Sequence, residues 1–229
     1  MLTLAQIKNK SASRLNGLHP VVRAAADLLI DRCYANGVPI LITQGLRTTA
    51  EQDALYAQGR TKPGAIVTNA RGGYSYHNYG LAIDFALLLP DGSSVSWELK
   101  RDGDHDRITD WQEVVQQAKN IGFEWGGDFT SIKDYPHFQM SFGMTISALR
   151  AGIKPSQSQI AAAYMLIEKE NDTLKREGIA IVKVNGVKIA DGLLENGVTF
   201  VPVRAIAEAL GAKVGYEAAT KTVEITSPR

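Results

Sequence analysis

Three residues have the side chains and spacing of a metal site. Asp84 lies inside the apolar segment 81–89, where an unpaired carboxylate would cost several kcal/mol, so it must be paired, protonated or bound to a cation. His77 precedes it in a loop rich in glycine and tyrosine, and His137 stands beside a second apolar segment, 138–142. Two imidazoles and one carboxylate can hold zinc and leave a fourth position for water. The alternative is that His77 is an ordinary loop residue and that Asp84 pairs with an arginine.

The composition excludes several other kinds of chemistry. The chain has 229 residues, of which 45% are hydrophobic and 21% charged, as in globular domains. Its single cysteine, Cys33, excludes an intrachain disulfide and a multi-thiolate metal site. Lys and Arg number 25 against 24 Asp and Glu, and this net charge of +1 offers no electrostatic footprint for nucleic acid. A transition-metal site must therefore be built from histidines and carboxylates.

The patterning predicts an α+β domain around these residues. Apolar residues at helical spacing predict helices over 16–36, 49–58 and 110–121. Strands are predicted over 38–43, 80–89 and 138–142, and the glycine-rich segment 59–80 is predicted to be an ordered loop. Asp84 then lies within the central strand, and His77 and His137 lie at its two flanks.

The segment Ser75–Asp84 reads SYHNYGLAID and matches a signature S-x-H-x-x-G-x-A-x-D. It resembles the VanY/VanX-type zinc peptidases, which cut peptides of bacterial cell walls that contain D-amino acids. Asp134-Tyr-Pro-His137 is similar to their downstream motif, in which the members that cleave D-alanyl-D-alanine have Glu in place of Asp134. This Asp, together with QGLRT, EQDALYAQGRT and EWGGDF, resembles the L-alanyl-D-glutamate peptidase branch, known from phage endolysins and a Bacillus cell-wall hydrolase. The resemblance covers roughly residues 10–150.

The resemblance implies a role for each matching residue. His77, Asp84 and His137 would be the zinc ligands, Asp134 the general base, and Arg47 the group that stabilises charge on the scissile carbonyl oxygen. Gln52 and Ser75 match positions near the substrate, and Trp125, beside two glycines, is a candidate for the cleft wall. The alternatives are a structural ion pair for Arg47, a turn cap for Asp134, and surface or loop hydrogen bonding for Gln52 and Ser75.

The implied fold is a small antiparallel sheet with flanking helices that hold one zinc ion, as in VanX and the hedgehog signalling domain. The implied function is a zinc endopeptidase, a peptidoglycan hydrolase that cleaves the L-alanyl-D-glutamate bond of stem peptides with water activated by zinc. Two alternatives remain open. One is a D-alanyl-D-alanine carboxypeptidase of the same family, and the other is a non-catalytic module that binds zinc or a peptide.

A second cluster of acidic residues lies in DGDHDRITDWQE, residues 102–113. Its acids occupy positions 1, 3, 5, 9 and 12 of an EF-hand-like spacing, but Arg107 stands at position 6, where a calcium loop needs glycine. The sequence therefore favours a solvated turn that ends in a helix cap.

The composition changes after residue 152. We expect a peptidase domain over 1–152, a linker or spacer helix over 153–178, and a small ββαβ-type module over 179–229, with Asn-Gly turns at 185–186 and 196–197. Residues 157–176 are the helical part, which could be a spacer or could pack on the first domain. The stretch VPVRAIAEALGA in 179–226 resembles the copper amine oxidase N-terminal-like (stalk) domain of Gram-positive envelope proteins, which implies attachment to the cell wall.

Two features bear on where the protein acts. No apolar run is long enough to span a bilayer, so we expect no membrane partner. The first 20 residues lack a basic start followed by an apolar stretch, so we expect synthesis in the cytoplasm without a signal peptide. An enzyme of this kind needs release to reach the wall, which favours a phage endolysin freed through a holin.

Overall fold

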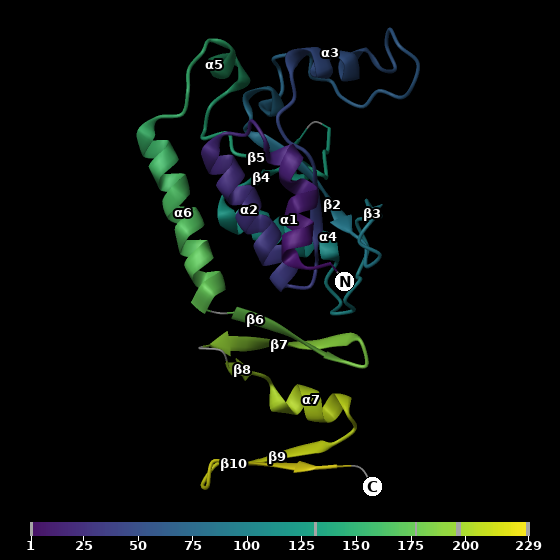
Figure 1. Cartoon of the computed structure of the whole chain (residues 1–229), viewed down its shortest axis with the longest axis vertical. Helices are drawn as coiled ribbons and strands as arrows, with labels where there is room; N and C mark the ends of the chain where they lie inside the picture. The colour runs from purple at the N-terminus through teal and green to yellow at the C-terminus, as the bar shows by residue number, and fades with distance from the viewer. Residues whose placement is uncertain (1, 131, 177, 196–197, 228–229) are drawn as a thin grey trace.

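A small antiparallel sheet forms the centre of the N-terminal domain, as predicted (Figure 1). The computed structural model describes residues 2–130, 132–176, 178–195 and 198–227. The strands pair in the order β1-β2-β5-β4, with β3 beside β2. Their bounds are Ile40–Gln44 (β1), Ala82–Leu88 (β2), Val95–Ser96 (β3), Glu124–Trp125 (β4) and His137–Gln139 (β5). The predicted strand 138–142 is shorter than expected, since only its first residues belong to β5.

Helices surround this sheet, and most begin and end close to their predicted bounds. They are α1 (Leu4–Ser11), α2 (Pro20–Ala35), α3 (Thr49–Ala57), α4 (Asp110–Ile121), α5 (Ile146–Arg150) and α6 (Gln157–Arg176). The helix predicted from residue 16 starts at Pro20, because His19 is its N-cap and proline suits the first helical position. Helix α1 was not predicted, and a capping box between Thr3 and Gln6 begins it. No described helix is long and apolar enough to cross a membrane.

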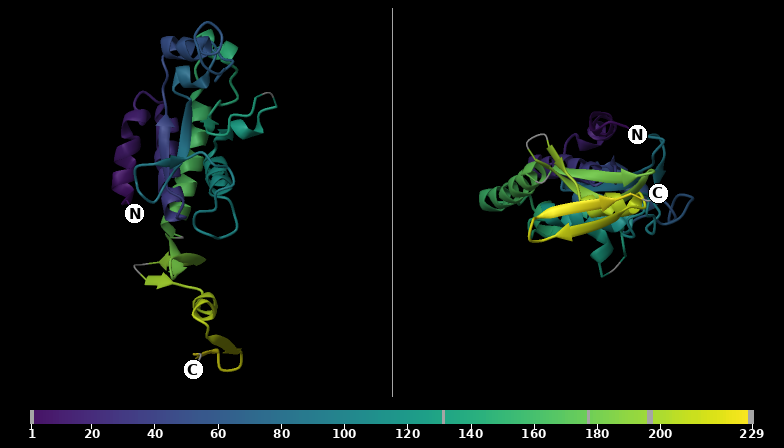
Figure 2. Two further views of the ribbon diagram at one scale, coloured as in Figure 1. Left: turned by 90° about the vertical axis from the view of Figure 1, so that its right-hand side faces the viewer. Right: turned by 90° about the horizontal axis from the view of Figure 1, so that it is seen from below.

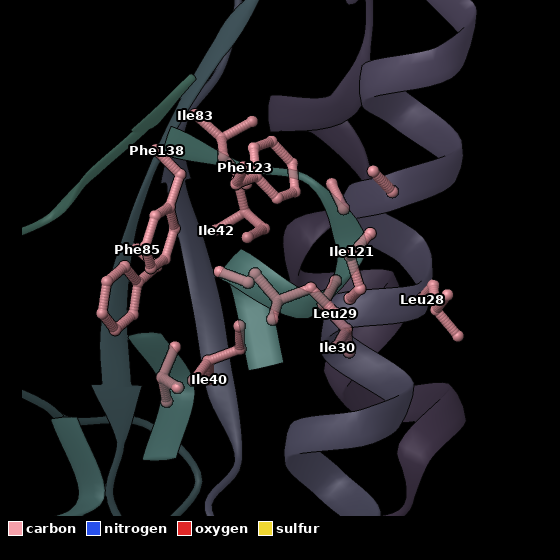
Figure 3. Packing of buried hydrophobic residues seen from close by; sticks show 14 of the residues in the cluster. Leu28, Leu29, Ile30, Ile40, Ile42, Ile83, Phe85, Ile121, Phe123 and Phe138 are labelled. Carbon is pink, nitrogen blue, oxygen red and sulfur yellow. The ribbon is translucent and has the colours of Figure 1, made fainter. Parts of the chain in front are cut away.

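The core lies between one face of the sheet and helices α2 and α4 (Figure 3). Ile83 and Phe85 of β2 point into it, and Phe85 stacks on Phe138 of β5 with ring centroids 4.9 Å apart. Successive strand residues project to opposite faces. Asp84 and His137 therefore project from the other face of the same strands.

Helix α6 packs against the N-terminal domain instead of standing apart from it. Ile167 is buried in the common core. The Arg32 guanidinium of α2 lies 3.2 Å from the Glu170 carboxylate and donates to the Glu170 carbonyl at 2.9 Å. Figure 1 shows α6 beside α2 along its length. The structure thus favours a packing helix over a spacer.

The C-terminal segment differs from the predicted ββαβ order. It forms a three-stranded sheet, the helix α7 (Val203–Ala209) and a separate hairpin (Figure 2). The sheet comprises β6 (Gly178–Val184), β7 (Val187–Glu195) and β8 (Val198–Phe200), and the hairpin comprises β9 (Lys213–Glu217) and β10 (Thr222–Thr226). The sequence analysis missed β9. Asn185 and Gly186 form the predicted turn, both with positive φ, whereas the turn at 196–197 lies outside the described residues.

Candidate active site

Three side chains converge at the end of β2 and β5. The Nε2 atom of His77 lies 3.1 Å from Nδ1 of His137 and 3.2 Å from Oδ1 of Asp84, and the remaining pair is 3.3 Å apart. Ligands of a tetrahedral zinc ion, each about 2.0–2.1 Å from it, are roughly 3.3 Å from one another. The three atoms therefore have the separation that a shared zinc ion requires, and they are one of the groups in the described chain that could hold a metal.

The outer nitrogen of each imidazole already has an acceptor. His77 Nδ1 lies 2.8 Å from the Gly45 carbonyl, and His137 Nε2 lies 3.0 Å from Oε1 of Gln139. A carbonyl oxygen can only accept, so each outer nitrogen carries the proton, and the inner nitrogens keep their lone pairs for a metal. Such partners fix the orientation and tautomer of metal-binding histidines.

Gln139 is itself held by a second carboxylate. Its amide nitrogen donates to Oε2 of Glu124 at 2.8 Å, and Glu124 also accepts from Ser141. The sequence analysis missed this chain of partners. The part of it that could have been predicted is the contact of Gln139 with His137. Side chains alternate between the two faces of a strand, so these two residues of β5 project from the same face.

The loop before β2 is built to present His77. Ser75 caps the short 3₁₀ helix Tyr76–Tyr79, and its hydroxyl accepts from the His77 N–H at 3.4 Å. Gly80 ends that helix with φ of 66°, and a Cβ there would lie 2.7 Å from the Gly17 carbonyl. Only glycine suits both requirements. Ser75 and Gly80 thus serve to place the His77 ring.

The charges of the site favour an ionised Asp84. Burial alone would raise its pKa, but the charges and hydrogen bonds of His77 and His137 outweigh burial and hold the pKa well below its usual range. Burial would lower the pKa of His137, yet its contacts with Asp84 raise it.

Arg47 lies beside this triad, held by Gln52. Its Nη1 donates to Oε1 of Gln52 at 2.8 Å, and its Nη2 lies 3.5 Å from Oδ2 of Asp84. Gln52 is 0% exposed, and its amide also donates to the Ala70 carbonyl at 2.8 Å. Gln52 has no exposed surface here with which to contact substrate, and that expected role stays a prediction. Gln52 orients Arg47 and the loop that contains Ala70.

Asp134 lies in the turn before β5 and lines the same cleft as the triad. The pKa of Asp134 is raised, first by partial burial and then by the nearby Asp84 charge, although His137, His77 and Arg47 act in the other direction and the residue stays exposed to solvent. The backbone N–H of Asp134 donates to the Gly126 carbonyl at 3.1 Å. A Cβ on Gly126 would lie 2.3 Å from the Asp134 carbonyl oxygen, so glycine permits this approach.

These residues surround a cleft of about 850 Å³. Arg47, Ser75 and Asp134 line it together with the three converging side chains. Trp125 is not among its lining residues. Instead, its indole N–H donates to the Tyr135 carbonyl at 2.7 Å, so Trp125 supports the turn that carries Asp134. A place for Trp125 in the cleft wall stays a prediction.

Comparison with known proteins gives matches over both parts of the chain. Residues 68–140 match the family model described as D-alanyl-D-alanine carboxypeptidase, and residues 183–229 match that of the copper amine oxidase N-terminal domain. The peptidoglycan L-alanyl-D-glutamate endopeptidase CwlK of Bacillus subtilis (strain 168) is 56% identical over 123 residues, 54% of this chain and 73% of that protein.

Two further similarities are more distant. The L-alanyl-D-glutamate peptidase of Listeria phage A118 is 33% identical over 134 residues, 58% of this chain but only 42% of the phage protein. The crystal structure of the Serratia marcescens L-Ala D-Glu endopeptidase ChiX matches with a TM-score of 0.42 and a sequence identity of 27%. The match covers 58% of this chain and 87% of that one.

The site and the sequence matches define the chain as a metallopeptidase. It belongs to the family of the peptidoglycan L-alanyl-D-glutamate endopeptidases. The resemblance seen in the sequence, including that of the C-terminal segment, is confirmed.

Proposed function

We propose that this protein is a zinc-dependent endopeptidase that cleaves the L-alanyl-D-glutamate bond of peptidoglycan stem peptides. The observation that carries the proposal is the convergence of His77, Asp84 and His137 within 3.1–3.3 Å, in a cleft that Arg47 and Asp134 also line. The choice of the L-alanyl-D-glutamate bond is supported by the names of the B. subtilis and phage relatives.

The three converging side chains would hold the zinc ion through His77 Nε2, Asp84 Oδ1 and His137 Nδ1. When bound, zinc polarises a carbonyl group and lowers the pKa of water towards 7. The fixed tautomers support this ligand set, because both inner nitrogens are free of protons. The protein's own groups then have to position the peptide, move one proton and stabilise charge.

Asp134 is the group that would move the proton. It lines the cleft beside the triad, and its raised pKa makes its carboxylate a better proton acceptor than an ordinary aspartate. Asp134 would accept a proton from the attacking water and return it to the leaving amine of the D-glutamate residue. Its backbone contact with Gly126 holds the turn in place for both transfers.

Arg47 is the group that would stabilise charge on the scissile carbonyl oxygen. Its guanidinium is fixed by Gln52 before substrate arrives, so no reorganisation is needed during the reaction. A preorganised donor of this kind contributes about 3–4 kcal/mol to transition-state stabilisation. Ser75, which lines the cleft, could contact the peptide, although its hydroxyl already accepts from His77.

The products of peptidoglycan digestion show which bond the enzyme cleaves. Purified peptidoglycan is incubated with the zinc-loaded protein, and the new amino termini are identified. A free amine on D-glutamate supports the proposal. Release of free D-alanine would instead show a D-alanyl-D-alanine carboxypeptidase, and zinc binding with no cleavage that a chelator can inhibit would show a non-catalytic module.

The C-terminal module would attach the enzyme to its substrate. The match to the copper amine oxidase N-terminal domain supports this role through the resemblance stated for envelope proteins. Removing residues 179–229 should reduce activity on intact walls more than on a soluble stem peptide, because tethering raises the effective substrate concentration. Equal loss on both substrates would show a structural role. Phage lysis and release through a holin stay predictions, since the relatives include a bacterial and a phage protein.

A further inference from the structure

The loop that precedes α4 collects acidic side chains that the peptidase reaction does not use. We call residues 102–113 the acidic loop; its carboxylates are Asp102, Asp104, Asp106, Asp110 and Glu113. Oxygen atoms of Asp104, Asp106 and Glu113 lie within 4.8 Å of one another, and so do those of Asp102, Asp104 and Asp110. Asp104 is common to both groups and thus lies at the centre of the loop.

Asp104 and Asp110 are the two most buried of these acids, and the Asp104 carboxylate accepts no hydrogen bond from the described residues. Asp104 is 5% exposed, and neither of its carboxylate oxygens has a hydrogen-bond partner among the described residues. The same is true of Oε2 of Glu113. Leaving a buried carboxylate oxygen without a partner is costly, and such charges are normally paired or bound to a metal.

The cation now beside these oxygens is the ammonium group of Lys188. This residue belongs to β7, which lies just below the N-terminal domain (Figure 1). Its Nζ atom is 3.3 Å from Asp104, 3.4 Å from Asp106 and 4.0 Å from Glu113. The contact with Asp104 is an ion pair and does not meet the geometry of a hydrogen bond.

One ammonium group does not balance the charge of the acidic loop. Arg101 pairs with Asp110 at 3.2 Å, and Lys188 is shared between Asp104, Asp106 and Glu113. The pKa of Glu113 reflects this shortage of positive charge. Burial and then the charges of Asp104 and Asp106 raise it to about 8, although the Lys188 charge lowers it. A divalent ion would supply the missing positive charge.

In the sequence, Arg107 at position 6 argued against a calcium-binding loop, and its backbone conformation removes that objection. A calcium loop needs glycine at position 6 because the backbone there turns sharply. Arg107 adopts φ of 76° and so takes the left-handed conformation without being glycine. Glu113, at position 12, lies in the first turn of α4, as the last ligand of such a loop does.

We propose that the acidic loop is a calcium site, bound through Asp104, Asp106 and Glu113 with Asp102 and Asp110 in support, and that the Lys188 ammonium competes for the same place. Carboxylate oxygens alone, without nitrogen or sulfur, are ligands that calcium prefers and zinc does not. Calcium tolerates irregular geometry and 6–8 oxygens, whereas magnesium demands a near-ideal octahedron of waters and few carboxylates.

Calcium titration of the zinc-loaded full chain tests the proposal. Terbium is bound first as a luminescent calcium probe, excited through Trp111 at the end of the loop, and calcium is then added to displace it. We expect calcium to displace terbium at concentrations at least tenfold below those of magnesium. We also expect calcium to raise the melting temperature of the parent protein.

Matched variants assign the binding to the loop. Asp104→Asn and the less buried Asp106→Asn should weaken calcium binding at least tenfold, whereas Asp172→Asn, an exposed site on α6 with the same charge change, should leave it unchanged. Lys188→Met should strengthen calcium binding at least tenfold, because it removes the competitor. Circular dichroism checks that each variant is folded.

Three results would overturn the proposal. The first is no displacement of terbium by millimolar calcium. The second is equal calcium affinity in the parent, Asp104→Asn and Asp106→Asn. The third is a Lys188→Met protein that binds calcium no better than the parent, which would refute the competition. None of these results depends on peptidase activity, so the proposed function can fail or hold independently.

Discussion

Oδ1 of Asp84 and Nδ1 of His137 lie 3.3 Å apart because their residues are directly opposite each other in the β2–β5 pair. Opposite residues of antiparallel strands project from the same face. The neighbouring pair, Ile83 and Phe138, projects from the other face into the core. One register therefore packs the core and assembles the site, and a slip of one residue would destroy both.

Loss of a metal ligand should have a larger effect than loss of the residue that orients it. His77→Ala, Asp84→Ala and His137→Ala should each release zinc. Gln139→Ala should retain zinc but bind it 10–100-fold more weakly, because His137 loses its hydrogen-bond partner. Elemental analysis and competition with a chromophoric chelator measure both effects. About one zinc per chain in all three ligand variants would show that the ligand set is wrong.

Asp134→Asn should separate proton transfer from metal binding. The amide keeps the shape of the carboxylate but cannot accept a proton. Zinc should remain bound, while kcat falls about 10²–10⁴-fold, or roughly 3–5 kcal/mol of barrier. KM should change much less, since the role belongs to the transition state. A zinc-loaded variant with kcat within fivefold of the parent would move the role to another carboxylate, of which Glu124 and Asp128 are the first to test.

Gln52→Met should weaken catalysis through Arg47. Methionine fills a similar volume but leaves the Arg47 guanidinium without its acceptor at 2.8 Å. We expect kcat to fall about tenfold with KM less affected, because a misplaced donor stabilises the transition state poorly. In a double-mutant cycle, Arg47→Ala with Gln52→Met should be no worse than Arg47→Ala alone. Additive losses would show that Gln52 acts separately from Arg47.

Gly126→Ala should displace the turn that carries Asp134. The added Cβ would lie 2.3 Å from the Asp134 carbonyl oxygen and 3.0 Å from Cβ of His137, so the turn has to move. We expect at least a tenfold loss of kcat. Gly215→Ala is the matched control, because a Cβ there meets nothing within 4 Å. Stem-peptide hydrolysis by both variants checks this, and equal activities would contradict the proposed place of Asp134.

Glu113 should make the calcium-free protein less stable as pH rises. Its pKa is about 8 in the folded chain and near 4.5 when unfolded, so the folded state binds the extra proton between these values. The free energy of unfolding therefore contains the full contribution of protonated Glu113 below about pH 4.5. It falls by on the order of 2–4 kcal/mol as pH rises from there to 8 and this contribution is lost. Denaturant unfolding from pH 5 to 8 should show a flatter profile for Glu113→Gln than for the parent. Identical profiles would contradict the raised pKa.

The sequence by itself determined most of the local elements of the first domain and predicted which groups meet at the site. Helix α4 and helix α6 have their predicted bounds, because the apolar periodicity of both and the caps of α4, Thr109 and Gly122, are local signals. The residues of SYHNYGLAID and DYPH marked the site for the same reason, since a motif needs only neighbours along the chain. The Asn-Gly turn at 185–186 is likewise a local signal.

Only the tertiary structure decided which distant residues meet. Gln139 and Gly45 orient the two imidazoles, Gln52 is buried beneath Arg47, and Lys188 reaches the acidic loop from the C-terminal segment. The Gly45 and Lys188 contacts join segments far apart in sequence, whereas Gln139 and Gln52 lie near their partners along the chain and meet them only once the local strand and helix have formed. A hydrogen-bond partner can be almost any polar residue, so its type carries little information until the fold brings it within 3 Å of its neighbour.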